Sequence, residues 1–223
     1  MKRKREIARV ITLYLSQSNA KHMNPTQLAQ LLGRIDIYLL DQVLKGRFTT
    51  NMRVLDAGCG SGRNCEYLLK AGCEVHGIDQ SAEAITYLQQ TLRPANPAHF
   101  VVGQVEAMPY EDASFDWVIS NAVLHFAKDV PHFEAMVYEM MRVLKPEGVL
   151  FARLASDIGI GHLIEPLEGG WYHLPDGSDR FLATETQLIA LTQKTKGQLV
   201  EPIKTTNVQN MRAMTTWVIK KTV

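Results

Sequence analysis

Two aspartates and a glycine-rich loop are the residues of this chain whose types and spacing could do chemistry. The segment VLDAGCGSGRN, residues 54–64, is an apolar run that ends on Asp56 and then carries a glycine at every second position. Glycines allow a backbone to approach a ligand closely, but a tight turn without a ligand also needs them. The carboxylate beside the loop therefore decides what the loop could bind.

The loop departs from the fingerprint of dinucleotide-binding proteins. Gly58, Gly60 and Gly62 form GxGxG, and Arg63 stands where that fingerprint has its third glycine. A pyrophosphate at this loop would be repelled by Asp56. Asp56 suits an ammonium group instead, while the loop N–H groups can receive a carboxylate, so the loop favours an amino-acid-like end.

A second aspartate indicates a ribose. Asp79 ends the run VHGIDQS, about twenty residues beyond the loop, where an acidic side chain can accept hydrogen bonds from both ribose hydroxyls. A ligand with a ribose, an amino-acid end and no pyrophosphate is S-adenosylmethionine. The spacing therefore predicts this cofactor.

Short strand-like runs alternate with helical patterns in the middle of the chain. The runs are RVLDAG, CEVHGID, HFVVGQ, FDWVISN and GVLFARL, and the helical patterns lie at 62–71, 82–92 and 132–144. Parallel strands need a crossover, which is usually a helix, so the order predicts an α/β fold with a mostly parallel sheet and helices on both faces. Ligands in such sheets lie beyond the carboxyl ends of the strands.

The ends of the chain add helices and a hairpin. Apolar spacing predicts helices over 6–16 and 25–46 with a break near Gly33, and these form an N-terminal helical cap, 1–48, before the main domain, 49–223. Residues 156–180 are rich in Gly, Pro and aromatic residues and are interpreted as a lid or a disordered insertion. A helix near 184–195 and two β-rich runs, 198–208 and 211–221, follow; the runs must pair antiparallel.

Composition excludes several classes of partner. The 24 basic and 23 acidic residues leave a formal charge of +1, which gathers neither nucleic acid nor an anionic membrane. The three cysteines form no CxxC pair, so neither a disulfide framework nor a metal site is predicted. The opening MKRKRE lacks the remainder of a signal peptide, and no run is long enough to span a membrane, so we expect a cytoplasmic protein.

Four segments together resemble the class I S-adenosylmethionine-dependent methyltransferases over about residues 50–155, of the type 11/12 kind: VLDAGCGSGRN, GIDQS, VVGQVEAMPYEDASFDWVISNAVLHF and LKPEGVLFARL. GCGSGRN and the terminal MTTWVIKK are also similar to the tellurite-resistance and thiopurine-type small-molecule branch. The resemblance implies a Rossmann-like seven-stranded sheet of order 3-2-1-4-5-7-6 with the last strand antiparallel.

The resemblance also implies roles for the residues at the strand ends. Asp79 would hold the ribose, Gln80 would lie along the adenine, and Asn121 would close the methionyl pocket. Relatives often have Asp-Ala where this chain has Gln104 and Val105, which are still expected to meet the adenine; Glu106 is either the acidic substitute or a solvated side chain. The methionyl end would be held by Asp56 and by the loop of Gly58, Cys59, Gly60 and Gly62.

The acceptor side of the site is less defined by sequence. A sulfonium is already an activated electrophile, so a general base is needed only if the nucleophile arrives protonated. His125 is the candidate base, with packing or helix capping as the alternative. Arg153 could pair with an anionic substrate or with Asp157. Aromatic and polar residues of the N-terminal helices and the insertion could line a substrate pocket or simply anchor loops: His22, Tyr38, His162, Trp171, Tyr172 and His173.

Absent motifs narrow the acceptor to a small molecule. No Pro-Pro-aromatic run of the kind found in amide-nitrogen and exocyclic-amine methyltransferases follows Asn121. All three cysteines precede position 74, so none is placed to serve as the nucleophile of cytosine C5 methylation. The function predicted is methyl transfer to an O, N, S or metalloid atom of a small molecule. The alternatives are a non-catalytic S-adenosylmethionine-binding protein, a methyltransferase acting on protein or RNA, and a nicotinamide oxidoreductase.

Overall fold

A computed structural model describes residues 24–223 of the chain, and these fall into two units. In the first, α2 (Pro25–Leu32) begins at Asn24, whose side chain accepts from the N–H of Gln27 in a capping box, and it ends at Gly33 with φ 60°. The break predicted near Gly33 is confirmed. The helix predicted over 6–16 and His22 lie outside the described residues.

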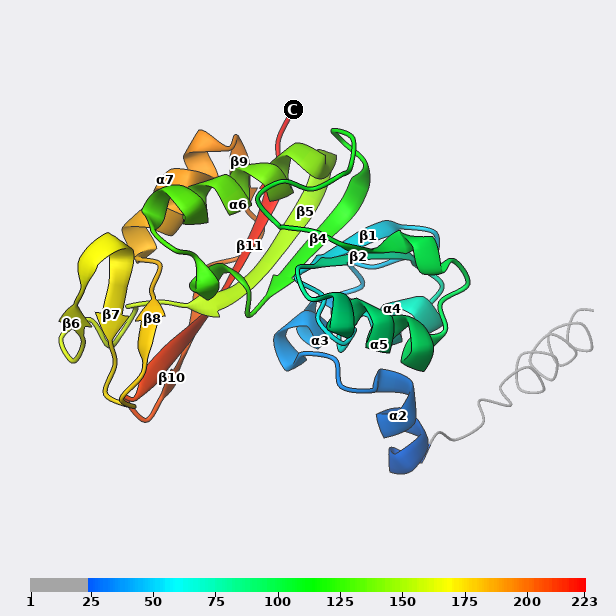
Figure 1. The fold of residues 1–223 in the computed structure, drawn as a ribbon, viewed down its shortest axis with the longest axis horizontal. Coiled ribbons are helices and arrows are strands. Elements are labelled where there is room, and N and C mark those ends of the chain that lie inside the picture. Colours follow the sequence, from blue (N-terminus) through cyan, green and yellow to red (C-terminus); the bar gives the residue numbers. More distant parts are fainter. Residues whose placement is uncertain (1–23) are drawn as a thin grey trace, which may run out of the picture. The chain divides into compact units, whose positions relative to one another are not determined.

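The second unit, residues 34–223, is built on one mixed sheet (Figure 1). Its parallel strands are β1 (Arg53–Ala57), β2 (Glu74–Asp79), β3 (Phe100–Val102), β4 (Phe115–Asn121) and β5 (Leu144–Ala155). Two later strands, β10 (Lys204–Val208) and β11 (Arg212–Lys221), complete the order β3-β2-β1-β4-β5-β11-β10, while β9 (Gly197–Leu199) also pairs with β11. Because β11 runs antiparallel to β5 and to β10, the predicted order and hairpin are both confirmed.

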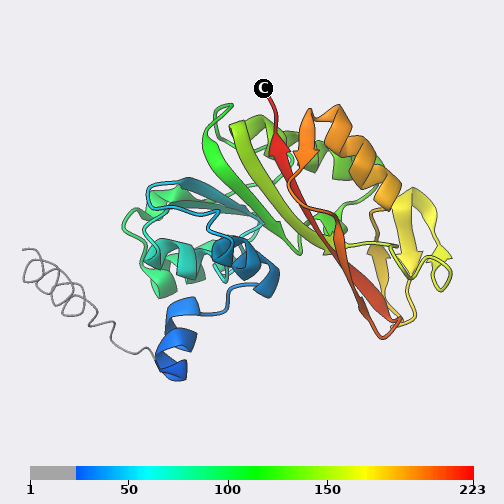
Figure 2. The same cartoon turned by 180° about the vertical axis from the view of Figure 1, so that it is seen from behind.

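Helices cover both faces of the sheet (Figures 1 and 2). One face packs against α3 (Ile37–Leu44), α4 (Cys65–Lys70) and α5 (Ala82–Leu92), and the other against α6 (Val130–Val143) and α7 (Glu185–Lys194). In β4, Trp117 and Ile119 point into the apolar core beneath α3, α4 and α5, whereas Val118 points into the core beneath α6 and α7. Strands that are buried on both faces are apolar without alternation, which explains the runs seen in the sequence.

The segment 156–180 and the residues just after it are folded. They contain β6 (Glu165–Pro166), the 3₁₀ turn η3 (Glu168–Gly170), β7 (Trp171–His173) and β8 (Asp179–Phe181), which form a small antiparallel sheet. Leu174 and Leu182 pack against Ala155 in a third apolar cluster. Of the two interpretations of this insertion, disorder is therefore excluded, and a lid role stays a prediction. No helix within residues 24–223 has the length and apolar character needed to cross a bilayer.

Candidate active site

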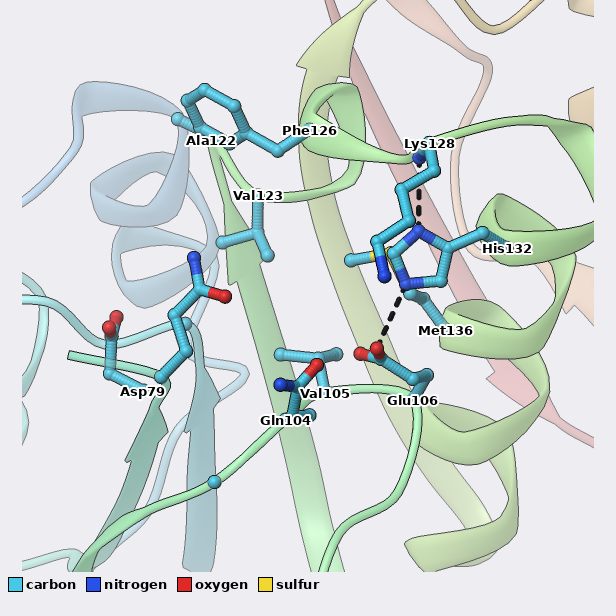
Figure 3. A pocket seen from close by; sticks show the side chains of 13 residues that line it. Asp79, Gln104, Val105, Glu106, Ala122, Val123, Phe126, Lys128, His132 and Met136 are labelled. Carbon is cyan, nitrogen blue, oxygen red and sulfur yellow. Dashed lines mark hydrogen bonds and ion pairs between the residues drawn. The ribbon is translucent and has the colours of Figure 1, made fainter. Parts of the chain in front are cut away.

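A cavity of about 310 Å³ opens at the carboxyl ends of β1, β2 and β4 (Figure 3). It contains six of the residues predicted to bind the cofactor, together with residues from the start of α6 and from the 3₁₀ turn η2 (Leu124–Phe126). The lining residues are Gly58, Asp79, Gln80, Gly103, Gln104, Val105, Glu106, Ala122, Val123, Phe126, Lys128, His132 and Met136.

Asp79 is held at the end of β2 by two backbone amides. Its Oδ2 accepts from the N–H of Gly60 at 2.8 Å, and its Oδ1 accepts from the N–H of Ser81 at 2.9 Å. Each carboxylate oxygen can accept more than one hydrogen bond, so both retain capacity toward the cavity. A carboxylate fixed in this way suits a pair of ribose hydroxyls.

The three loop glycines are required for different reasons. A Cβ on Gly58, which has φ +83°, would lie 2.3 Å from a Val123 methyl, and one on Gly62 would lie 2.7 Å from Leu92. Gly60, at φ +50°, has nothing within 4 Å of that position. Packing therefore explains Gly58 and Gly62, whereas Gly60 leaves open space beside Asp79 that a ligand can fill.

Asp56 lies beneath the loop and outside the cavity lining. Its side chain is 2 % exposed and accepts from the Cys65 thiol at 3.3 Å. Burial raises the pKa of Asp56 to about 7, with a further contribution from the charge of Asp79. Cys59 is also buried, and burial raises the pKa of its thiol, so it behaves as a small apolar residue.

Buried polar atoms without partners gather at the carboxyl ends of β4 and β5. Among the described residues, both amide atoms of Asn121, the Ser120 hydroxyl and the Nε of Arg153 have no hydrogen-bond partner. Asn121 and Arg153 are paired across the two strands. Ser120 lies on the opposite face of the sheet from Asn121 and Arg153, because successive strand residues alternate between faces. Unsatisfied buried polar groups are costly, so the atoms of Asn121 and Arg153 call for a polar ligand. The carboxylate and ammonium of a methionyl group offer the matching acceptors and donors, and the residues present therefore fit S-adenosylmethionine.

His125 lies in η2 and is buried. Its Nδ1 accepts from the N–H of Ala155 at 3.4 Å. Burial, followed by the positive charges of Arg180 and Arg153, lowers the pKa of His125 to about 4. A histidine with this pKa is a poor proton acceptor at neutral pH, which counts against the base role; that role stays a prediction.

Tyr38 and Arg153 come together at the end of β5. The guanidinium of Arg153 lies 4.7 Å from the centre of the Tyr38 ring and donates to Asp36 at 3.2 Å. Asp36 also accepts from Arg63 at 3.3 Å, and the Tyr38 hydroxyl contacts Thr206. Arg153 thus pairs with Asp36, which was not among its expected partners, instead of with Asp157, and its pairing with an anionic substrate stays a prediction.

The aromatic residues of the insertion do not line the cavity themselves, although Trp171 contacts the backbone of the lining residue Lys128. The Trp171 indole donates to the carbonyl of Lys128 at 2.9 Å, and Tyr172 packs against the third apolar cluster. His173 lies 2.6 Å from Asp179, whose carboxylate raises the pKa of His173. His162 lines a second, more open hollow beside Asp157. Trp171, Tyr172 and His173 therefore each have a local structural partner, and the substrate role of all four residues stays a prediction.

Lys128, His132 and Met136 line the cavity, although the sequence did not indicate them as site residues. The sequence placed the helix at 132–144, but Asp129 caps it through the N–H of His132 at 2.8 Å, and Pro131 lies in its first turn. The signal that could have found them is this Asp-x-Pro helix start. It brings the first turn of α6 to the carboxyl end of β4.

Glu74, His76 and His99 form a group with metal-ligand chemistry at the opposite end of β2. Arg53 donates to Glu74 at 2.9 Å, and the two imidazoles stack with centroids 3.9 Å apart and planes 14° apart. Parallel rings do not direct their nitrogens at one point, and Arg53 already balances the carboxylate. The group is therefore explained as packing.

Comparisons with known proteins agree with this geometry. Residues 55–152 match the Methyltransferase domain family. A malonyl-[acyl-carrier protein] O-methyltransferase of Enterobacter lignolyticus is 35% identical over 143 residues, which are 63% of this chain and 53% of that protein. The chain thus spans about half the length of this relative.

Two solved structures share the fold. An S-adenosylmethionine-dependent methyltransferase of Methanosarcina mazei superposes with a TM-score of 0.66 at 22% identity, covering 81% of this chain and 97% of that one. The 1,6-didemethyltoxoflavin-N1-methyltransferase of Burkholderia thailandensis, solved with S-adenosylhomocysteine, superposes with a TM-score of 0.60 at 20% identity. The match covers 98% of this chain and 90% of that one. The narrower similarity to the tellurite-resistance and thiopurine-type branch stays a prediction. Residues 55–152 thus form a Methyltransferase domain, and the sheet order and the solved structures show the fold of the class I S-adenosylmethionine-dependent methyltransferases.

Proposed function

We propose that this chain transfers a methyl group from S-adenosylmethionine to a small-molecule acceptor. The observation that carries the proposal is Asp79, which is fixed by the amides of Gly60 and Ser81 at one end of a cavity of about 310 Å³. Asp79 accepts hydrogen bonds from the ribose hydroxyls, and Gln80 and Val105 lie along the purine. When bound, the cofactor supplies a methyl group that is already activated by its sulfonium.

The polar atoms at the ends of β4 and β5 hold the amino-acid end. Asn121 can both donate to a carboxylate and accept from an ammonium group. The buried Asp56 lies beneath the glycine loop of residues 58–62. A cation in this position favours the charged form of Asp56, whose pKa burial has raised. These residues orient the sulfonium.

The acceptor atom attacks with a lone pair that is free at neutral pH. His125 is a weak base in its buried position, so the site favours acceptors that need no deprotonation, such as a carboxylate oxygen. The relative from Enterobacter lignolyticus is named as an O-methyltransferase, which agrees with an oxygen acceptor. A cytoplasmic location is part of the same proposal, and the near-neutral charge favours neither a nucleic-acid nor a membrane partner.

The test is a methyl-transfer assay with methyl-labelled S-adenosylmethionine and a panel of small carboxylates, amines, thiols and phenols. We expect label in an extracted small-molecule product and stoichiometric S-adenosylhomocysteine. Cofactor binding without transfer to any acceptor class would support the non-catalytic alternative. Binding of NAD without binding of S-adenosylhomocysteine would refute the proposal.

A further inference from the structure

The turn between η2 and α6 forms one wall of the cavity. Lys128 and His132 line the cavity from this turn, and Figure 3 shows the N–H of Lys128 donating to Nδ1 of His132, at 3.0 Å. The side chain of Asp129 accepts from the N–H of His132 at 2.8 Å. A ligand in the cavity therefore meets side chains whose places depend on how this turn is held.

The insertion contacts this turn from outside the cavity. The indole N–H of Trp171, which does not line the cavity, donates to the carbonyl of Lys128 at 2.9 Å. This carbonyl precedes α6, in which the N–H of Phe133 donates to the carbonyl of Asp129 at 3.0 Å. Side chains thus hold both backbone groups of Lys128, because His132 accepts from its N–H and Trp171 donates to its carbonyl.

The backbone of η3 packs closely on the same turn. Gly170 has φ +92°, and a Cβ there would lie 3.1 Å from a Val130 methyl and 2.7 Å from the Phe181 ring. A Cβ on Gly169 would lie 3.5 Å from the Cβ of Asp129. Because a side chain at Gly170 would not fit, the insertion meets the start of α6 in direct contact.

Trp171 is itself fixed within the small sheet. It pairs with Phe181 of β8, its carbonyl accepts from the N–H of Leu167 at 2.8 Å, and its side chain packs on the core beneath α6 and α7. The Phe181 ring lies 5.1 Å from the ring of Phe133 in α6. A donor on a side chain that is already ordered loses little further conformational entropy when it bonds to Lys128.

We propose that Trp171 is a positioning residue for cofactor binding: its hydrogen bond to the carbonyl of Lys128 holds the cavity wall of Lys128 and His132 in the conformation that receives the cofactor. Trp171 does not touch the cofactor, and the insertion acts here as a fixed support behind the wall. This role differs from the substrate contact that the sequence suggested for Trp171. The inference rests on the proposed function, because it requires S-adenosylmethionine in this cavity.

Calorimetric binding of S-adenosylhomocysteine to two variants of Trp171 separates the hydrogen bond from the packing. Trp171→Phe keeps a six-membered ring and removes the donor. Trp171→His keeps an N–H at the corresponding position of its five-membered ring and removes the fused six-membered ring. We expect Trp171→Phe to lower the affinity about three- to tenfold, the effect of one hydrogen bond, and Trp171→His to bind more tightly than Trp171→Phe.

Asp179→Ala is the matched control in the small sheet. It removes the contact between Asp179 and His173 at 2.6 Å but leaves the bond from Trp171 to Lys128 in place, so it should bind S-adenosylhomocysteine as the unchanged chain does. Circular dichroism at the temperature of the titrations shows whether each variant is folded. A purely structural role of Trp171 would lower the melting temperature and leave the affinity of the folded chain unchanged.

Equal affinity of Trp171→Phe and the unchanged chain would overturn the inference. Equal losses in Trp171→Phe and Trp171→His would also overturn it, because they would assign the effect to packing. So would a loss in Asp179→Ala as large as that in Trp171→Phe, because any disturbance of the small sheet would then suffice. Failure of the unchanged chain to bind S-adenosylhomocysteine would instead refute the proposed function itself.

Discussion

Asp56 is a single carboxyl group whose burial makes its charge costly. Burial raises the pKa of Asp56 from an ordinary 3.8 to about 7. The free energy of unfolding therefore falls as the pH rises from about 4 to 7, and it stays lower above that range. We expect Asp56→Asn to stabilise the ligand-free chain, by about 2 kcal/mol more at pH 8 than at pH 5. Urea unfolding at both pH values measures this. An equal gain at the two pH values would mean that packing, not ionisation, is responsible.

Asp79 provides a residue-level test of the ribose assignment. Asp79→Ala removes the acceptor of two backbone amides and of the ribose hydroxyls, so we expect the affinity for S-adenosylhomocysteine to fall by about 1–3 kcal/mol. Calorimetry measures the loss. Glu83→Ala, in the first turn of the neighbouring α5, is the control and should bind normally. Unchanged affinity in Asp79→Ala would refute the assignment.

At the scale of elements, Asp36 ties α3 to the sheet. Its carboxylate caps α3 through the N–H of Tyr38 at 2.9 Å and accepts from Arg63 and Arg153. We expect Asp36→Ala to lower the free energy of unfolding by about 2 kcal/mol, and Asp36→Asn, which keeps the cap, by less. Chemical denaturation measures both losses.

The control for Asp36 is a cap in the other unit. Asn24 caps α2 in the same way, so Asn24→Ala should leave the main unfolding transition in place. If Asp36→Ala also left that transition unchanged, α3 would not contribute to the stability of the second unit.

The helices and strands that could be predicted are those whose own sequence contains both a start signal and an end signal. The helix predicted over 82–92 is α5 to the residue, because Ser81 caps its start and Arg93 ends it in a left-handed conformation. The small sheet of β6, β7 and β8 was not predicted, because strands of two or three residues are too short for an alternation to be read. Tyr172 of β7 and the flanking Leu174 and Leu182 pack with Ala155, a contact between distant residues that local sequence does not encode.

The candidate site shows the same limit over longer distances. Asp79 and the glycine loop were predictable because each stands at the end of an apolar run, where a parallel sheet places its ligands. Arg153 and Asp36 are 117 residues apart in the chain, and Glu106 meets His132 from a different element. Such pairs are created by the closure of the whole fold, so neither residue carries a local signal for its partner.

At the scale of the whole molecule, the cavity couples cofactor binding to stability. It is lined by residues that follow β1, β2 and β4 and by the start of α6, so a bound ligand contacts segments that separate on unfolding. A ligand that binds only the folded chain stabilises it by about 2.7 kcal/mol at a hundred times its dissociation constant. For a chain of this size we expect the melting temperature to rise by about 5–10 °C with S-adenosylhomocysteine. Differential scanning calorimetry of the unchanged chain and of Asp79→Ala checks this: the variant should show a smaller shift at the same ligand concentration, and an equal shift in both would place the ligand outside this cavity.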